Sequence, residues 1–243
     1  MRIDVALTAH TAGAMPLAGV SVLVIDVLRA STSIITALIN GCAAVIPVAT
    51  AEEAHQRAGA LPSHTVLIAG ERRGEPLAGF DLGNSPFDFT VERVSGKTLI
   101  MTTSNGTQAL LAARGAAAIG VAGLVNLGAA AMWALGGRRD VTLVCAGERG
   151  AISLEDHACA GLLVDRLQRE EPAAELSPTA REALAVGRRY GKDVGRLGED
   201  SSWARHLTSR GRGRDVAACL MLDTRTVVPV YRPNVDNVVI GSR

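Results

Sequence analysis

Two short stretches of nearly the same sequence place acidic and basic side chains directly after apolar runs. They are LIAGERRG, residues 67–74, and LVCAGERG, residues 143–150. Each apolar run is typical of a buried strand, and the residues that follow a strand in an α/β protein often form its ligand site. Further acids come after both stretches, among them Asp81, Glu155 and Asp156. This pattern predicts an acidic cleft that holds a metal ion.

Residues 23–32, LVIDVLRAST, predict a buried strand that ends on Asp26 and leads into a helix. A buried carboxylate without a partner is costly, so metal ligation or catalysis is the simplest role for Asp26. Arg29, Ser31 and Thr32 stand at the helix start, where free N–H groups and a guanidinium suit a bound oxyanion. The structural alternative is that Asp26 pairs with Arg29 and that Ser31 only caps the helix.

A second strand-to-helix junction, LIMTTSNGTQAL, covers residues 99–110. The small side chains of Ser104, Asn105 and Thr107 can surround phosphate oxygens at a helix start, and Gly106 lets the backbone approach closely. The junction is not a Walker loop, because no lysine follows the glycine. The same residues also make an ordinary turn and helix cap, which is the alternative interpretation.

The acids near the predicted strand ends favour one kind of metal. All of them fall on the edge where parallel sheets bind ligands; they are Asp26, Glu71, Asp81, Glu148, Glu155 and Asp156. Oxygen donors without a cluster of His or Cys suit Mg²⁺ rather than Zn²⁺. Glu155 and Asp156 alone carry little weight, because the helix dipole favours acids in a first turn without any metal.

Apolar runs that alternate with helical patterns position these residues. The predicted strands are residues 2–7, 20–26, 43–48, 65–69, 97–103, 117–122 and 140–145. The predicted helices between them are residues 30–40, 51–60, 106–114 and 126–135. Strands without polar alternation are buried on both faces, so we expect an α/β protein with a largely parallel sheet, a mixed sheet being the alternative, that helices cover on both sides.

Beyond residue 150 the pattern becomes helical. Helices are predicted near residues 154–170, 178–191 and 213–222, followed by one strand, Val227 to Tyr231. We expect a single domain over residues 1–243, in which residues 151–225 form a helical lid or subdomain. Nine Lys or Arg stand against four Asp or Glu between Arg181 and Arg214. This excess is either a solvated helical face or an attractor for an anionic substrate.

Composition favours a small-molecule partner. The chain has 243 residues, 48% of them hydrophobic, and a net charge of +1, too small for a protein whose main partner is nucleic acid. Its four cysteines lack metal-site spacing and are typical of a cytoplasmic protein. Residues 115–137 are uncharged but contain six glycines, which favours a strand, turn and helix over a membrane span. A homodimer is the default expectation.

Five motifs together resemble the 2-phosphosulfolactate phosphatase family, also called the ComB family, over nearly the whole chain. The motifs are IDVLRAST, GERRGEPLAGFDLGNSP, TTSNGTQAL, AGERGAISLEDHACAG and GRDVAACLMLDTRTVVPV. The resemblance implies a three-layer α/β/α fold. It also implies a Mg²⁺-dependent acid phosphatase that hydrolyses 2-phospho-3-sulfolactate to 3-sulfolactate and phosphate, a step of coenzyme M biosynthesis in methanogens. The family pattern does not require a histidine at position 157, so acid catalysis is not assigned to His157.

Residue roles follow from the motifs and the resemblance together. Expected catalytic residues are Asp26, Arg29 and Asn105, and expected phosphate ligands are Ser31, Thr32, Ser104, Gly106 and Thr107. Expected metal ligands are Asp26, Glu148, Glu155 and Asp156. Expected contacts to the substrate's other groups are Arg72, Ser85 and Arg149, with Arg225 as a further donor and Asn84 beside Ser85.

Two alternatives to this function stay open. The first keeps the metal and phosphate sites but assigns another small phosphorylated hydroxy acid as substrate. The second is a non-catalytic protein that binds an anion or metabolite, whose acids form structural ion pairs with Arg72 and Arg149. Direct attack by water and a phospho-enzyme formed on Asp26 are both compatible with the sequence.

Overall fold

The apolar runs of the sequence form one sheet in the computed structural model, which describes residues 1–241. The predicted strands are β1 (Arg2–Ala6), β2 (Ser21–Ile25), β3 (Ala44–Pro47), β4 (Val66–Arg72), β6 (Thr98–Thr102), β7 (Ala118–Ala122) and β8 (Val141–Cys145). Where these strands neighbour one another they are parallel. Every residue of β2 is buried, so this strand shows no polar alternation.

A hairpin from the end of the chain lies in the middle of the sheet and makes it mixed. It consists of β10 (Pro229–Arg232) and β11 (Asn237–Ile240), which pair antiparallel with β7 and β3. The full order is β5-β4-β6-β3-β11-β10-β7-β2-β8-β1-β9. Short strands β5 (Glu75–Pro76) and β9 (Glu175–Leu176) form the two edges. The late predicted strand is confirmed, and its central position is a result of the tertiary structure.

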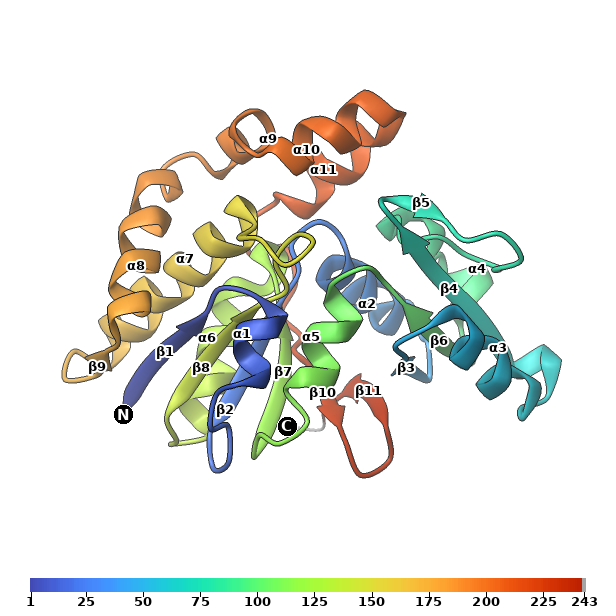
Figure 1. Cartoon of the computed structure of the whole chain (residues 1–243), viewed down its shortest axis with the longest axis horizontal. Coiled ribbons are helices and arrows are strands. Elements are labelled where there is room, and N and C mark those ends of the chain that lie inside the picture. Colours follow the sequence, from blue (N-terminus) through green and yellow to red (C-terminus); the bar gives the residue numbers. More distant parts are fainter. Residues whose placement is uncertain (242–243) are drawn as a thin grey trace.

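Helices cover both faces of the sheet (Figure 1). On one face α6 (Leu127–Gly136), α7 (Leu154–Glu170) and α8 (Pro178–Tyr190) pack in a core that includes Leu23 and Ile25 of β2. On the other, α1 (Ala9–Gly13), α2 (Ala30–Ile39) and α5 (Gly106–Ala112) share a core with Val22 and Val24. Near the β4 edge, α3 (Ala51–Gly59) contacts β4 and β6. The predicted three-layer α/β/α fold is confirmed.

Three short helices lie above the carboxyl ends of the strands (Figure 1): α9 (Leu197–Asp200), α10 (Ser202–Leu207) and α11 (Gly213–Cys219). Helices α1, α4 (Val91–Val94), α9 and α10 have no counterpart among the predicted helices, because none is long enough to show a helical period. The lid assigned to residues 151–225 stays a prediction. In the structure α7 and α8 belong to the main layers, and only the helices after them cover the strand ends.

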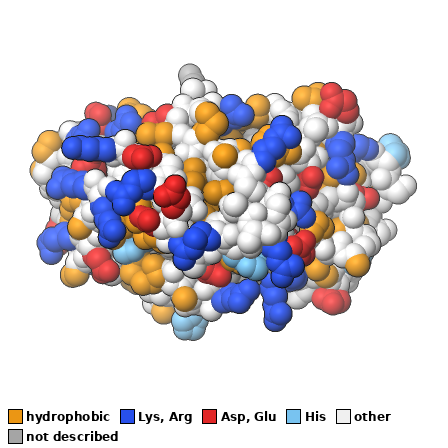
Figure 2. All heavy atoms as spheres, turned by 90° about the horizontal axis from the view of Figure 1, so that it is seen from above, with side chains coloured by type: hydrophobic (Ala, Val, Ile, Leu, Met, Phe, Trp, Pro, Cys, Tyr) orange, Lys and Arg blue, Asp and Glu red, His pale blue; other side chains and the backbone are white. Residues whose placement is uncertain are grey.

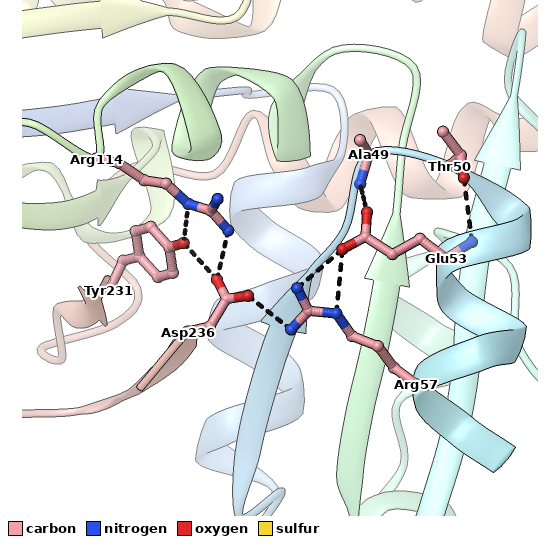
Figure 3. Close-up of polar contacts among 7 residues, drawn as sticks. All are labelled: Ala49, Thr50, Glu53, Arg57, Arg114, Tyr231 and Asp236. Atoms are coloured by element: carbon pink, nitrogen blue, oxygen red, sulfur yellow. Dashed lines mark hydrogen bonds and ion pairs between the residues drawn. The ribbon is translucent and has the colours of Figure 1, made fainter. Parts of the chain in front are cut away.

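Polar contacts anchor the β10–β11 hairpin to its neighbours (Figure 3). The Asp236 carboxylate accepts hydrogen bonds from Arg114 Nη2 at 2.7 Å and Tyr231 Oη at 2.6 Å. It also pairs with Arg57 Nη1 at 2.6 Å, and Arg57 continues to Glu53 Oε1 at 2.8 Å. The hairpin is thereby tied to α3 and to the end of α5.

No helix within residues 1–241 is long and apolar enough to cross a membrane. The uncharged residues 115–137 instead form β7 and α6, as predicted.

Candidate active site

The loops after four parallel strands meet at one edge of the sheet, below the C-terminal helices. Asp26 follows β2, Arg73 follows β4, Asn105 follows β6 and Glu148 follows β8. Parallel strands bring their carboxyl ends to the same edge, so these distant segments become neighbours. The face seen from above, which carries the C-terminal helices, shows many Lys and Arg side chains with acids among them (Figure 2).

Two adjoining cavities lie at this edge. A narrow one, here called the acid pocket, is lined by Asp26, Leu28, Asn105, Gly147, Glu148, Ser153, Glu155, Asp156 and Trp203. A wider one of about 630 Å³, here called the arginine cavity, is lined by Ala49, Arg72, Arg73, Thr103, Ser104, Asn105, Gln108, Glu148, Arg149 and Trp203. Asn105, Glu148 and Trp203 belong to both, so the structure joins the acids directly to a basic, solvent-open cavity.

Asp26 is buried at the start of α2, and its Oδ1 accepts a hydrogen bond from the Ala30 N–H at 3.2 Å. Gly106 packs so closely that a Cβ there would lie 2.6 Å from Asp26 Oδ2. Burial, with the charges of Glu71 and Glu155, raises the pKa of Asp26 to about 7, although the Ala30 N–H and Arg29 oppose the shift. The group that closely approaches the backbone at Gly106 is thus the Asp26 carboxylate.

The first turn of α7 adds two more buried acids. Asp156 accepts hydrogen bonds from the Val27 N–H at 2.8 Å and the Gly147 N–H at 3.1 Å, which joins the ends of β2 and β8. Glu155 accepts one from the Ser201 hydroxyl at 2.7 Å. Burial raises the pKa of both carboxyls, and the charge of Asp26 adds to the shift of Asp156. A bound cation would relieve this mutual repulsion.

The donor chemistry of the acid pocket fits Mg²⁺. Within residues 1–241, no three His, Cys, Asp or Glu side chains form a ready-made metal cluster. Mg²⁺ commonly needs only one or two carboxylates, with waters and substrate phosphate oxygens completing its shell. The hydrogen bonds described here use one carboxylate oxygen each of Asp26 and Glu155 but both oxygens of Asp156. Asp26 and Glu155 are therefore the better suited pair, and Asp156 acts as a scaffold.

Glu71 and Asp81 lie outside both cavities. Glu71 accepts hydrogen bonds from the backbone N–H groups of Gly74 and Ser104, each at 2.7 Å, and so holds the loop after β4 against the loop after β6. Asp81 Oδ2 accepts from the Ile68 N–H at 2.8 Å, beside the middle of β4. The expectation that Asp81 lies past a strand end is wrong, because residues 79–82 run back along the β4 edge.

Arg29 and Ser85 meet at Asp215, a residue absent from the predicted site. Arg29 Nη1 donates to Asp215 Oδ2 at 2.6 Å, Arg29 Nη2 donates to the Gly74 carbonyl at 2.8 Å, and Ser85 Oγ donates to Asp215 Oδ1 at 2.7 Å. All three side chains are buried. The alternative in which Arg29 pairs with Asp26 is wrong. The sequence does contain one signal for Asp215. This acid lies four residues before Cys219, and both are on the buried face of α11.

The predicted phosphate ligands lie in different surroundings. Ser104 lines the arginine cavity, as does Asn105, a predicted catalytic residue. Ser31 Oγ accepts from the Asp26 N–H at 3.0 Å, and Thr107 exchanges hydrogen bonds with Thr103 at the start of α5, so both serve local structure.

Some predicted ligands line a different cavity altogether. Thr32 and Arg225 face a separate cavity of about 580 Å³ next to α2, and neither lines the acid pocket or the arginine cavity. Asn84 is buried behind α2, where its carbonyl accepts from Ser33 Oγ at 2.9 Å. His157 lines none of these three cavities, and burial lowers its pKa. Tertiary packing, not residue type, separates these side chains from the site.

The arginine cavity contains both predicted arginines and two residues that the sequence did not indicate. Arg72 donates to Thr102 Oγ1 at 2.9 Å and to the Glu71 carbonyl at 2.8 Å. Within residues 1–241 neither Arg72 nor Arg149 forms an ion pair with the acids of the site. Trp203 of α10 donates from Nε1 to the Leu28 carbonyl at 3.1 Å and lines both cavities. Arg73 is the other addition.

The fold and site define an α/β protein with buried acids and a basic cavity at the carboxyl ends of its strands. The model of the 2-phosphosulpholactate phosphatase family matches residues 8–234. The chain belongs to this family.

Individual relatives agree. A protein of Thermotoga petrophila named "Probable 2-phosphosulfolactate phosphatase" is 43% identical over 210 residues, 85% of this chain and 86% of its own length. Proteins with the same name from Symbiobacterium thermophilum and from Clostridium botulinum Eklund 17B are 37% and 32% identical. Those matches cover 88% and 95% of this chain and 92% and 97% of the relatives.

Proposed function

We propose that this protein is a Mg²⁺-dependent phosphatase that hydrolyses 2-phospho-3-sulfolactate to 3-sulfolactate and phosphate, the type of step used in coenzyme M biosynthesis. The observation that carries the proposal is the junction of the acid pocket and the arginine cavity at Asn105 and Glu148. A phosphate ester at this junction would have acids on one side and guanidinium groups on the other. The names of the relatives support the substrate.

Asp26 and Glu155 are the proposed Mg²⁺ ligands, with Glu148 at the rim of the same pocket. At this place Mg²⁺ would act as a Lewis acid toward a phosphoryl oxygen and would offset the repulsion between the ester and the buried acids. Asp156 keeps the first turn of α7 in register with β2 through its hydrogen bond to the Val27 N–H.

The remaining polar groups bind and orient the substrate. Asn105 lies at the junction, where its amide NH₂ can donate to phosphate oxygens. Ser104 lines the arginine cavity, and its hydroxyl donates to Glu71 Oε2 at 3.2 Å. Arg72 and Arg149 line the wider cavity together with Arg73, and guanidinium groups suit the acidic groups that the substrate carries besides the phosphoryl group. Arg29 is a positioning residue, because its charge favours the ionised form of Asp26 while its guanidinium is bonded to Asp215 and Gly74.

Phosphate release from 2-phospho-3-sulfolactate tests the proposal, with Mg²⁺ present or removed by EDTA. We expect activity that depends on Mg²⁺ and is lost in Asp26→Asn. The matched control is Asp81→Asn, which makes the same substitution at an acid of another family motif that lies beside β4 and outside the site. Full activity of Asp26→Asn would refute the metal role. A panel of phosphorylated hydroxy acids, compared by kcat/KM, decides between this substrate and a related one.

We further propose a cytoplasmic location and a homodimer. All four cysteines, Cys42, Cys145, Cys159 and Cys219, are free and buried, which suits a reducing compartment. Fractionation of the native cells tests the location, and light scattering of the purified protein tests the dimer.

A further inference from the structure

The two Gly-Glu-Arg stretches fold into two hairpin turns of the same type. Residues 72–75 form the first, because Arg72 pairs antiparallel with Glu75 across a two-residue loop. Residues 148–151 form the second through an antiparallel bridge between their end residues. In each loop an arginine and then a glycine have positive φ, the pattern of a type I′ turn. The φ angles are +56° and +84° for Arg73 and Gly74, and +51° and +79° for Arg149 and Gly150.

Arginine is an unfavourable choice at this place in the turn. Positive φ suits Gly, Asn and Asp, whereas a larger side chain raises the energy of the loop. Residues in such sparsely populated regions cluster at ligand clamps and active sites. Arg138 also has positive φ, so the backbone alone assigns no role; what distinguishes Arg73 and Arg149 is that both stand at the same position of a hairpin and line the same cavity.

Two consecutive residues hold the two turns against one cavity. Ser104 Oγ accepts a hydrogen bond from the Arg73 N–H at 3.2 Å, and Asn105 Oδ1 accepts one from the Arg149 N–H at 3.2 Å. Both arginines line the arginine cavity of about 630 Å³. Both are exposed, and within residues 1–241 neither guanidinium has a hydrogen bond or ion pair to the protein. The guanidinium of Arg72, in contrast, is bonded to Thr102.

We propose that Arg73 and Arg149 form an arginine clamp that selects substrates carrying two acidic groups besides the phosphoryl group, one guanidinium for each. The inference rests on the proposed function and deepens it, because it assigns the carboxylate and the sulfonate to the two hairpins. A guanidinium binds either group through two parallel N–H donors. The hydrogen bonds to the neighbouring residues Ser104 and Asn105 hold the backbones of the two arginines at one cavity, from which both guanidinium groups can reach the same substrate.

Glycine variants test the clamp without disturbing the turns. Arg73→Gly and Arg149→Gly remove the guanidinium at a position where glycine is the favoured residue, so the melting temperature should stay equal or rise. We expect KM for 2-phospho-3-sulfolactate to rise about ten- to hundredfold in each variant. The matched control is Arg138→Gly. Arg138 is exposed, has φ of +48° and lies outside the arginine cavity, so KM should stay unchanged.

Binding of the product, 3-sulfolactate, tests the clamp independently of the proposed function. Calorimetry with 3-sulfolactate needs no turnover, and we expect the affinity of both glycine variants to fall about as much as KM rises. Phenyl phosphate lacks the two acidic groups, so its KM should be the same in all variants. Wild-type protein that binds 3-sulfolactate but does not cleave the ester refutes the function, and loss of binding in the variants still supports the clamp. The clamp is overturned if both glycine variants keep the wild-type KM for 2-phospho-3-sulfolactate and the wild-type affinity for 3-sulfolactate.

Discussion

Arg29 Nη1 lies 2.6 Å from Asp215 Oδ2, although 186 positions separate the two residues. The contact ties α11 to the loop after β2, three residues beyond Asp26. It is buried on both sides, with side chains only 3% and 6% exposed. The C-terminal helices are therefore bonded to the same loop that carries the central acid of the site.

Asp215→Asn should destabilise the protein strongly. The change leaves the buried Arg29 guanidinium without its counter-charge, which typically costs about 3–5 kcal/mol. The free energy of unfolding from urea titration checks the expectation. Arg166→Gln serves as control, because the Arg166–Asp223 pair is 44% and 35% exposed and should contribute no more than about 1 kcal/mol. Equal stability of wild type and Asp215→Asn would contradict the prediction.

Asp26 should make the metal-free protein less stable as the pH rises. Its pKa is raised from 3.8 to about 7 on folding, so the folded state binds the Asp26 proton more tightly than the unfolded chain. This contribution is complete below the unfolded pKa and is lost as the pH rises through about 7. In EDTA, the stability of wild type relative to Asp26→Asn should fall by a few kcal/mol over that window. A constant difference across the window refutes this assignment.

Glu155→Gln and Asp156→Asn should separate a metal ligand from a scaffold residue. Glu155→Gln removes a repelling charge, so stability should hold or rise while the Mg²⁺ concentration for half-maximal activity increases. Asp156→Asn puts an amide NH₂ where a carboxylate accepts two backbone N–H groups, which should cost about 1–3 kcal/mol. Melting curves and Mg²⁺ titrations of both variants check the contrast. If instead Asp156→Asn increases the Mg²⁺ concentration for half-maximal activity and Glu155→Gln lowers the stability, Asp156 is the metal ligand and Glu155 the scaffold residue.

Asp236→Asn should loosen the hairpin network and leave catalysis intact. Asp236 raises the pKa of Tyr231, which burial and this carboxylate together bring to about 12. The variant should lower the Tyr231 pKa, which ultraviolet titration measures, and should cost about 1 kcal/mol because the network is partly exposed. KM should not change. A Tyr231 pKa that stays at the wild-type value would show that burial alone sets it.

Local patterns in the sequence are sufficient for most elements of the fold. The apolar run Val22–Ile25 of β2 indicates burial on both faces, and the start of α2 is visible three to four residues after Asp26. The convergence of Asp26, Asn105 and Glu155 also follows, because parallel strands must end at one edge. Each of these conclusions depends on a few neighbouring residues and on one general rule of sheet geometry.

The tertiary structure alone decided which residues contact one another. Asp81 and Asp26 both follow glycine-rich or apolar runs, yet one borders β4 and the other lines the acid pocket. Thr32 and Ser31 are adjacent in the chain and point to different surroundings, because successive helical residues face about 100° apart. The sequence by itself determined the elements and the edge that carries the site. Only the tertiary structure decided that Arg29 pairs with Asp215 and that the β10–β11 hairpin lies in the middle of the sheet. Both depend on contacts between residues far apart in the chain, which no short stretch of sequence contains.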